Sequence, residues 1–124
     1  MDEPLVREVL LAFWKVHILH HAQQRPVYGQ WMMEELRRHG FTLSPGTLYP
    51  LLARMERHGW LRGQRAPDAS VKARREYVLT KAGARVLAQI RRQVDALHGE
   101  VVLGRSGSVV PRRATAAGAG VTLG

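Results

Sequence analysis

The stretch that decides the fold spans residues 41–61 and reads FTLSPGTLYPLLARMERHGWL. Its Ser-Pro pair, Ser44 and Pro45, is typical of a helix start, because a serine hydroxyl can accept from a free backbone N–H and a first-turn proline has no N–H to leave unpaired. Apolar residues then recur one helical turn apart, in a stripe formed by Leu48, Leu51, Leu52 and Met55. Gly59 follows, and glycine readily adopts the left-handed backbone that ends many helices. The stretch therefore predicts a short helix with one buried face.

The opposite face of this predicted helix has hydrogen-bonding and cationic groups. These outward residues are Thr47, Tyr49, Pro50, Arg54 and Arg57, with Glu56 as the opposing acid. A short helix that is buried on one side and positive on the other fits the major groove of DNA. Pro50 argues against a regular helix here, because a proline inside a helix removes one hydrogen bond and costs about 3 kcal/mol. We therefore expect either a distorted first turn or a regular helix that begins near Tyr49.

The composition narrows the class of protein. Nineteen Lys and Arg residues against ten Asp and Glu residues give the 124-residue chain a formal net charge of +9, which favours a polyanionic partner. A membrane surface is the alternative, but no uncharged apolar run is long enough to span a bilayer. The absence of cysteine excludes disulfides, thiolate metal sites and thiol catalysis. The first residues lack the basic-then-apolar pattern of a signal peptide, so we expect a cytoplasmic protein with no membrane segment.

Two further helices are predicted before this stretch. The first runs from Asp2, a suitable cap, to about Ala22. Its apolar residues lie on two faces, which are Leu5, Val9, Phe13 and Val16 on one side and Val6, Leu10, Trp14 and Ile18 on the other. We expect such a helix to be covered by its own domain and also by something else. The second runs from about Tyr28 to His39, and its inward residues are Gly29, Met32, Met33 and Leu36. Together with the helix after Ser44, it predicts a helix-turn-helix.

The pattern then changes to two short β-compatible segments, 60–66 and 74–80, joined by the turn-rich sequence PDASVKA. Such a pair predicts a β-hairpin, the wing of a winged helix. Five cations lie in or between these strands: Arg62, Arg65, Lys72, Arg74 and Arg75. Only Asp68 and Glu76 oppose them, so the set favours contact with phosphate. The alternative is a charged hairpin tip that is simply solvated.

Thr80 is a suitable N-cap for a last helix over about 81–100. Small and apolar residues repeat every three or four positions along it, at Gly83, Leu87, Ile90, Val94, Leu97 and Val101. This heptad seam extends beyond what a two-stranded wing would cover, so we expect it to pack against a second copy of the chain. The predicted dimer interface consists of Leu5, Val9 and Phe13 of the first helix with Leu87, Ile90, Val94 and Leu97 of the last. The alternative is a helix that lies on its own domain.

These patterns predict a mainly α fold with a small β-hairpin, in three parts. Residues 1–80 form a winged helix-turn-helix DNA-binding domain that includes the N-terminal helix, 81–103 form a C-terminal dimerisation helix, and 104–124 form a tail. The tail has three arginines and no acids, and it lacks the large apolar groups of a core. We therefore expect it to be disordered.

A histidine cluster is a candidate metal site. His17, His20 and His21 lie three and four positions apart on the first predicted helix, so their imidazoles project from neighbouring positions. Three nitrogens suit zinc or a similar divalent ion, and His98 is a candidate for a further ligand. The alternative is that these rings pack or form hydrogen bonds near the helix end, or contact DNA phosphate when protonated. The other predicted elements require no cofactor.

The sequence resembles the PadR family of winged-helix transcriptional regulators. The similarity rests on SPGTLYPLLARMERHGWL, with VYGQWMMEELRRHGF before it and RREYVLTKAGARVL after it, and covers about residues 13–100. The short final helix resembles the compact branch of the family, with one C-terminal dimerisation helix. The resemblance implies that DNA is approached by Ser44, Gly46, Thr47, Tyr49 and Pro50, and that Tyr28 lies near the DNA backbone. It also implies a wing in an adjacent groove and a homodimer on an inverted-repeat operator of double-stranded DNA, usually a repressor that an effector releases.

The residues themselves add four cations to the expected DNA contacts: Arg54 on the helix, and Arg65, Lys72 and Arg74 on the wing. A small aromatic or metal effector is expected in the dimer crevice, where Trp14 offers a stacking surface. Enzymatic function is not expected, because no pair of carboxylates suits a cleft and GRSGS at 104–108 differs from the G-x-S-x-G nucleophile pattern. Two alternatives remain: a metal-binding sensor built on the histidine cluster, and a winged-helix interaction module that binds no DNA.

Overall fold

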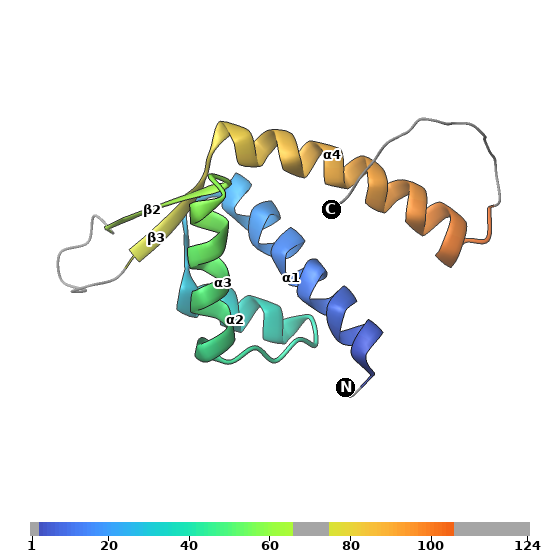
Figure 1. The fold of residues 1–124 in the computed structure, drawn as a ribbon, viewed down its shortest axis with the longest axis horizontal. Coiled ribbons are helices and arrows are strands. Elements are labelled where there is room, and N and C mark those ends of the chain that lie inside the picture. Colours follow the sequence, from blue (N-terminus) through green and yellow to red (C-terminus); the bar gives the residue numbers. More distant parts are fainter. Residues whose placement is uncertain (1–2, 66–74, 106–124) are drawn as a thin grey trace. The chain divides into compact units, whose positions relative to one another are not determined.

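The computed structural model describes residues 3–65 and 75–105 of the chain. Its elements in order are α1 (Pro4–Gln24), β1 (Val27–Tyr28), α2 (Gly29–Arg38), α3 (Pro45–Arg57), β2 (Leu61–Arg65), β3 (Arg75–Leu79), α4 (Lys81–Leu97) and the π-helical turn η1 (His98–Val102), as drawn in Figure 1. Contacts divide the chain into two units, Met1–Gln89 and Ile90–Gly124. The fold is mainly helical with a small antiparallel sheet, which confirms the predicted class.

The apolar stripe of α3 lies in the centre of the core, as predicted. Its four residues are at most 1% exposed: Leu48, Leu51, Leu52 and Met55. The surrounding buried side chains include Ile18, Leu19, Val27, Met32, Leu36, Leu61 and Leu87. Gly59 has a φ of 83°, and this left-handed conformation confirms that it closes the helix.

Ser44 is the N-cap of α3 and Pro45 is its first residue, as predicted. The N-cap of α1 is Glu3, whose Oε1 accepts from the Leu5 N–H at 2.7 Å; the predicted cap, Asp2, lies outside the described residues. Among those residues, the Ser44 side chain caps no backbone N–H of α3. Its Oγ donates to Thr47 Oγ1 at 3.3 Å instead. The prediction that the Ser44 hydroxyl accepts a backbone N–H is therefore wrong, although Ser44 occupies the predicted cap position.

The sheet has three strands in the order β1–β3–β2, whereas the sequence predicts two. β2 and β3 are the predicted wing strands, and they pair antiparallel from Leu61 opposite Leu79 to Arg65 opposite Arg75. β1 pairs with the other edge of β3, and it moves the start of α2 to Gly29. The strand was missed because two residues are too short for an alternating pattern.

Thr80 caps α4 as predicted, because its Oγ1 accepts from the Gly83 N–H at 2.9 Å. The same hydroxyl donates to the carbonyl oxygen of Gly59. A Cβ at Gly83 would collide with the carbonyl oxygen of Trp60, so the first turn of α4 lies directly on the turn that leaves α3. The start of α4 is thus packed against the backbone at Gly59 and Trp60, directly after α3.

The predicted seam of α4 changes from buried to exposed along the helix. Leu87 is fully buried, whereas Val94 is 46% and Leu97 is 55% exposed. The α-helix ends at Leu97 rather than near residue 100, and the chain continues as η1, in which the Leu103 N–H donates to the His98 carbonyl at 3.0 Å. This wider i→i+5 bonding is that of a π-helical turn.

The histidines of α1 lie in a cluster of aromatic rings with α2 and the segment that follows it. The ring centroid of His17 lies 6.2 Å from that of His21, 5.3 Å from His39 and 5.6 Å from Phe41. His21 in turn lies 5.3 Å from Trp31 in an edge-on arrangement. The geometry within the cluster is therefore that of packed rings.

Protonation of His17 and His21 is disfavoured in the folded protein, because both have a lowered pKa. Burial lowers the pKa of His17, and the neighbouring charges of His39 and His20 lower it further. Burial also lowers the pKa of His21, followed by the charge of His20. Glu35 acts in the opposite direction on both rings. The unfolded chain therefore binds protons at these positions at a higher pH than the folded chain does.

We predict that these two histidines make stability depend on pH. Their contribution is complete above the unfolded histidine pKa of about 6.5 and is lost as the pH falls below it toward the lowered folded pKa. Thermal unfolding at about pH 7.5 and about pH 5.5 should show a smaller decrease for the His17→Gln/His21→Gln variant than for wild type. His98→Gln, a histidine of the other unit, serves as the control and should retain the wild-type decrease. Equal decreases in wild type and the double variant would contradict the prediction.

Candidate nucleic-acid interface

The outward face of α3 is exposed over its whole length. Its exposed residues, with the N-cap Ser44, are Pro45, Gly46, Thr47, Tyr49, Pro50, Ala53, Arg54 and Arg57. Because the opposite stripe is fixed in the core, these residues share one side of the molecule. The face presents two guanidinium groups beside hydroxyls and an aromatic ring, while Glu56 is half-buried at its edge. This combination suits a polyanion that also offers hydrogen-bonding edges.

Pro50 lies inside α3, which runs without interruption from Pro45 to Arg57. Of the two alternatives expected for Pro50, a regular helix that begins only near Tyr49 is therefore wrong. Pro50 has no N–H to donate, so it leaves the carbonyl of Gly46 without its usual partner four residues on. Both residues are exposed, and water can hydrate that carbonyl, which explains why the helix tolerates the proline here.

Tyr49 is packed against the start of α2 through a glycine. A Cβ at Gly29 would lie 2.5 Å from Tyr49 Cε1 and 2.6 Å from its hydroxyl oxygen. No side chain therefore fits at this position without moving the Tyr49 ring. Tyr49 is nevertheless 43% exposed, so one part of the ring rests on α2 while the rest faces solvent. Tyr28, directly before α2, is half-buried.

The predicted wing cations occupy different surroundings. Arg65 is exposed at the end of β2, and Arg62 donates to Gln64 Oε1 at 3.4 Å. Arg75 forms an ion pair with Glu56 of α3, with 3.1 Å between Nη2 and Oε2. Lys72 and Arg74 lie outside the described residues. The sequence did not indicate the pairing of Arg75, because Glu56 is distant in the chain and lies in a different element.

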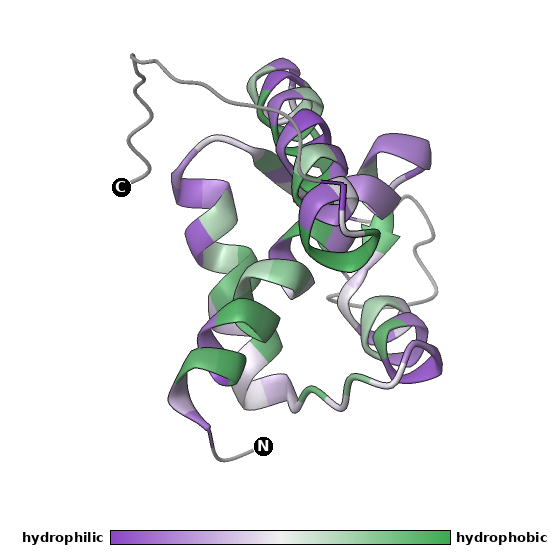
Figure 2. Ribbon diagram, turned by 90° about the vertical axis from the view of Figure 1, so that its right-hand side faces the viewer, coloured by the Kyte–Doolittle hydropathy of each residue, from purple (hydrophilic) through white to green (hydrophobic). Residues whose placement is uncertain are grey.

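Two helices expose apolar side chains, each in its own unit. On α1 the exposed residues are Leu5, Val6, Val9 and Phe13, and in the second unit they are Val94, Leu97, Val101, Val102 and Leu103. Figure 2 shows the apolar residues continuing through the N-terminal turns of α1. Ile90 is half-buried and Leu87 is buried. Such contiguous exposed apolar residues on a small protein are typical of an interaction surface.

The predicted metal ligands are neighbours, but they do not converge. His17 and His21 stack at 6.2 Å, and His20 lies edge-on to His21 at 4.9 Å. His20 Nε2 is also 3.3 Å from Gln24 Nε2. Across the ranges 3–65 and 75–105, no group of three or more His, Cys, Asp or Glu side chains has the arrangement needed to hold a metal ion.

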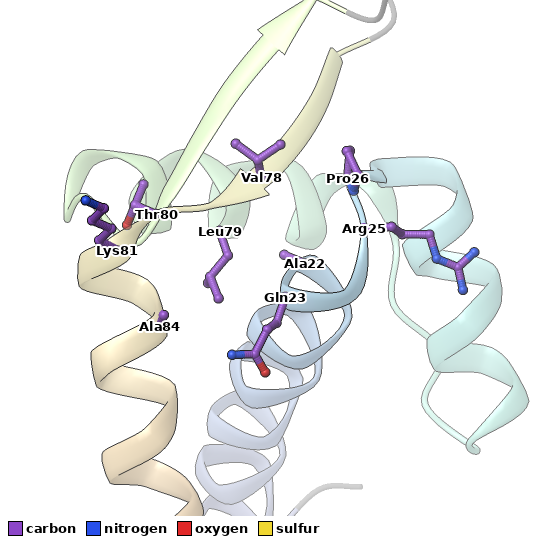
Figure 3. Close-up of a pocket in the computed structure, with 9 residues that line it drawn as sticks. All are labelled: Ala22, Gln23, Arg25, Pro26, Val78, Leu79, Thr80, Lys81 and Ala84. Atoms are coloured by element: carbon purple, nitrogen blue, oxygen red, sulfur yellow. The ribbon is translucent and has the colours of Figure 1, made fainter.

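A surface cavity of about 400 Å³ lies where the end of α1 meets β3 and the start of α4. Figure 3 shows Leu79 pointing between the two helices, with Ala22 and Ala84 beside it. The Arg25 side chain points away toward α2, and its Cζ lies 5.2 Å from the Trp31 ring centroid. The polar groups around this cavity therefore do not converge on one point, as they would in a specific ligand site.

None of the helices in the described ranges has the length and hydropathy required to cross a bilayer.

Residues 18–89 match the Transcriptional regulator PadR-like family. Over 102 residues, the chain is 46% identical to Transcriptional regulator Rv3488 of Mycobacterium tuberculosis. The aligned region covers 82% of this chain and 94% of that protein.

Solved structures agree with this match. A transcriptional regulator from Streptococcus is 30% identical with a TM-score of 0.66, covering 82% of this chain and 96% of the other. A PadR-like transcriptional regulator from Bacillus cereus is 26% identical with a TM-score of 0.70. The match covers 80% of this chain and 99% of that one. The family match includes the helix-turn-helix, the sheet and the first turns of α4, and these relatives are regulators and not enzymes. The chain belongs to the PadR-like family of transcriptional regulators.

Proposed function

We propose that the protein regulates transcription by binding double-stranded DNA as a homodimer, with α3 in the major groove and the wing on adjacent phosphates. The observation that supports this most directly is the exposed face of α3, where Arg54 and Arg57 accompany Thr47 and Tyr49 opposite a fully buried stripe. Arginine can donate two hydrogen bonds to a guanine edge, and hydroxyls can bind bases or phosphates. Arg65 on β2 would add a phosphate contact beside the groove.

The formal charge of +9 supports the same proposal. Phosphate contacts release counterions from DNA, so the affinity of such a protein falls steeply as the salt concentration rises. A winged-helix module that only binds other proteins would still bind any duplex weakly at low salt because of this charge, but it would not prefer one DNA sequence over another. A preference for one duplex over a scrambled duplex of the same composition therefore separates the proposed function from this alternative.

We predict that Tyr49→Ala and Arg54→Ala each weaken binding to a duplex that wild-type protein selects from a random pool. A lost base contact of this kind costs about 1–3 kcal/mol. Gly29→Ala should weaken binding too, because its methyl group would displace the Tyr49 ring. Fluorescence anisotropy at one fixed salt concentration measures the effect.

Arg85→Ala is the matched control, since it removes the same charge from the exposed side of α4. It should leave the affinity for the selected duplex nearly unchanged. If Tyr49→Ala and Arg54→Ala both bind like wild type, α3 is not the element that contacts the bases.

The homodimer is the second part of the proposal, and the exposed apolar residues of α1 and of the second unit support it. A symmetric pair presents two copies of α3, which suits an inverted repeat. Val94→Glu and Leu97→Glu should each convert the dimer to a monomer, because each buries a carboxylate in an apolar interface. Sedimentation equilibrium measures the change. Ala96→Glu adds the same charge outside the seam and should remain dimeric; if all three variants remain dimeric, this helix is not the interface.

The finer part of the proposal is repression that a small aromatic compound or a divalent metal ion relieves. Its support is the ring cluster, to which Trp14 also belongs, because its ring lies edge-on to Phe41 with 6.3 Å between the ring centroids. Trp14 Nε1 and His21 Nε2 are buried without a hydrogen-bond partner among the described residues. An effector that binds one conformation better shifts the population away from the DNA-bound form. Planar phenolic compounds and zinc, titrated into the complex with the selected duplex, should include at least one that lowers the affinity. An unchanged affinity throughout would contradict effector release.

A further inference from the structure

Glu56, in the last turn of α3, contacts both strands of the wing. Its Oε2 lies 3.1 Å from Arg75 Nη2 and its Oε1 lies 3.3 Å from the same nitrogen. Oε2 also accepts from the backbone N–H of Gly63 at 3.1 Å. One carboxylate therefore joins the helix to β2 through the backbone and to β3 through a side chain.

Gly63 is the residue that allows this contact. A Cβ at Gly63 would collide with Arg75 Nη2 and would lie 2.9 Å from Cζ and 3.0 Å from Nε. The guanidinium group therefore crosses β2 in the space where another residue would have its side chain. On its other side, Arg75 Cζ lies 5.7 Å from the centroid of the Tyr77 ring, within the range of a cation–π contact.

The charge of Glu56 is unusual for its position. A carboxylate at the edge of a cationic face repels phosphate, so by charge alone its removal should increase affinity for any duplex. The Glu56 and Arg75 side chains are only 34% and 51% exposed, and the two residues come from different elements. Glu56 can therefore favour DNA binding only through the geometry that it imposes on the wing.

We propose that Glu56, Gly63 and Arg75 form an α3–wing bridge that fixes the wing at the angle at which it and α3 engage one duplex together. The inference rests on the proposed DNA binding. Glu56 and Arg75 are positioning residues in this arrangement. The bridge contributes to the preference for the correct duplex, because a wing at the wrong angle still attracts phosphate but does not align with α3.

The sign of the Glu56→Gln effect tests the bridge. The probes are a duplex selected by wild-type protein from a random pool and a scrambled duplex of the same length and composition. Losing one partly exposed ion pair and one charge-assisted hydrogen bond should reduce the preference for the selected duplex by roughly three- to tenfold. Binding to the scrambled duplex should be unchanged or tighter. Equal tightening on both duplexes would overturn the bridge, since that is the result of charge removal alone.

Arg75 supplies a second, independent variant. Arg75→Lys retains the positive charge but loses the planar group that contacts Glu56. The bridge predicts a reduced preference, whereas a simple phosphate contact predicts none. The Glu56→Gln/Arg75→Lys double variant should lose no more than the larger single effect, because both changes break the same contact. Additive effects would overturn the proposal.

Glu34→Gln is the matched control. Glu34 pairs with Arg37 at 3.2 Å, but both lie on α2, so the variant removes the same charge without touching the wing. It should leave the preference at the wild-type value, and thermal unfolding confirms that every variant is folded. Wild-type protein that enriches no duplex from the random pool, or that binds the enriched and scrambled duplexes equally, would refute the proposed function, whereas wild-type preference that survives in the Glu56 and Arg75 variants would refute only the bridge.

Discussion

The burial of the α3 stripe is the constraint on which the proposed interface depends. A helix advances by a fixed rotation at each residue, so once Leu48, Leu51 and Leu52 face the core, the direction of every other side chain follows. Truncating a buried leucine to alanine typically costs about 2–5 kcal/mol, which makes any rotation of α3 about its axis unfavourable. The outward direction of Tyr49 and Arg54 is therefore a property of the core as much as of those residues.

The turn after α3 extends this constraint to the rest of the first unit. Thr80 binds the Gly59 carbonyl through its hydroxyl, and its N–H donates to the Trp60 carbonyl at 3.1 Å. The wing strands leave and return at this turn, and the first turn of α4 is packed on it through Gly83. Helix α3, the sheet and the beginning of α4 are thus connected over a few residues of backbone.

The sequence was informative wherever a regular period or a special backbone angle was required. The stripe of α3, the cap at Thr80 and the left-handed Gly59 all follow from such rules. It failed where the determinant was a partner distant in the chain. Strand β1 exists because β3 offers an edge, and Glu56 acts with Gly63 and Arg75 because folding brings two elements together. The Ser44 hydroxyl shows a third limit, since the sequence identified the N-cap residue but not whether its side chain accepts a backbone N–H.

The contact between Gly29 and Tyr49 has a consequence for how these two positions can vary. Since a Cβ at residue 29 would occupy the space of the aromatic ring, the two sites behave as one steric unit. A protein of this fold that has a larger residue at the first site is expected to have a smaller or differently placed one at the second. A change in preference for DNA sequence would then require substitutions at both positions together. A comparison of many homologous protein sequences should show the two positions covarying.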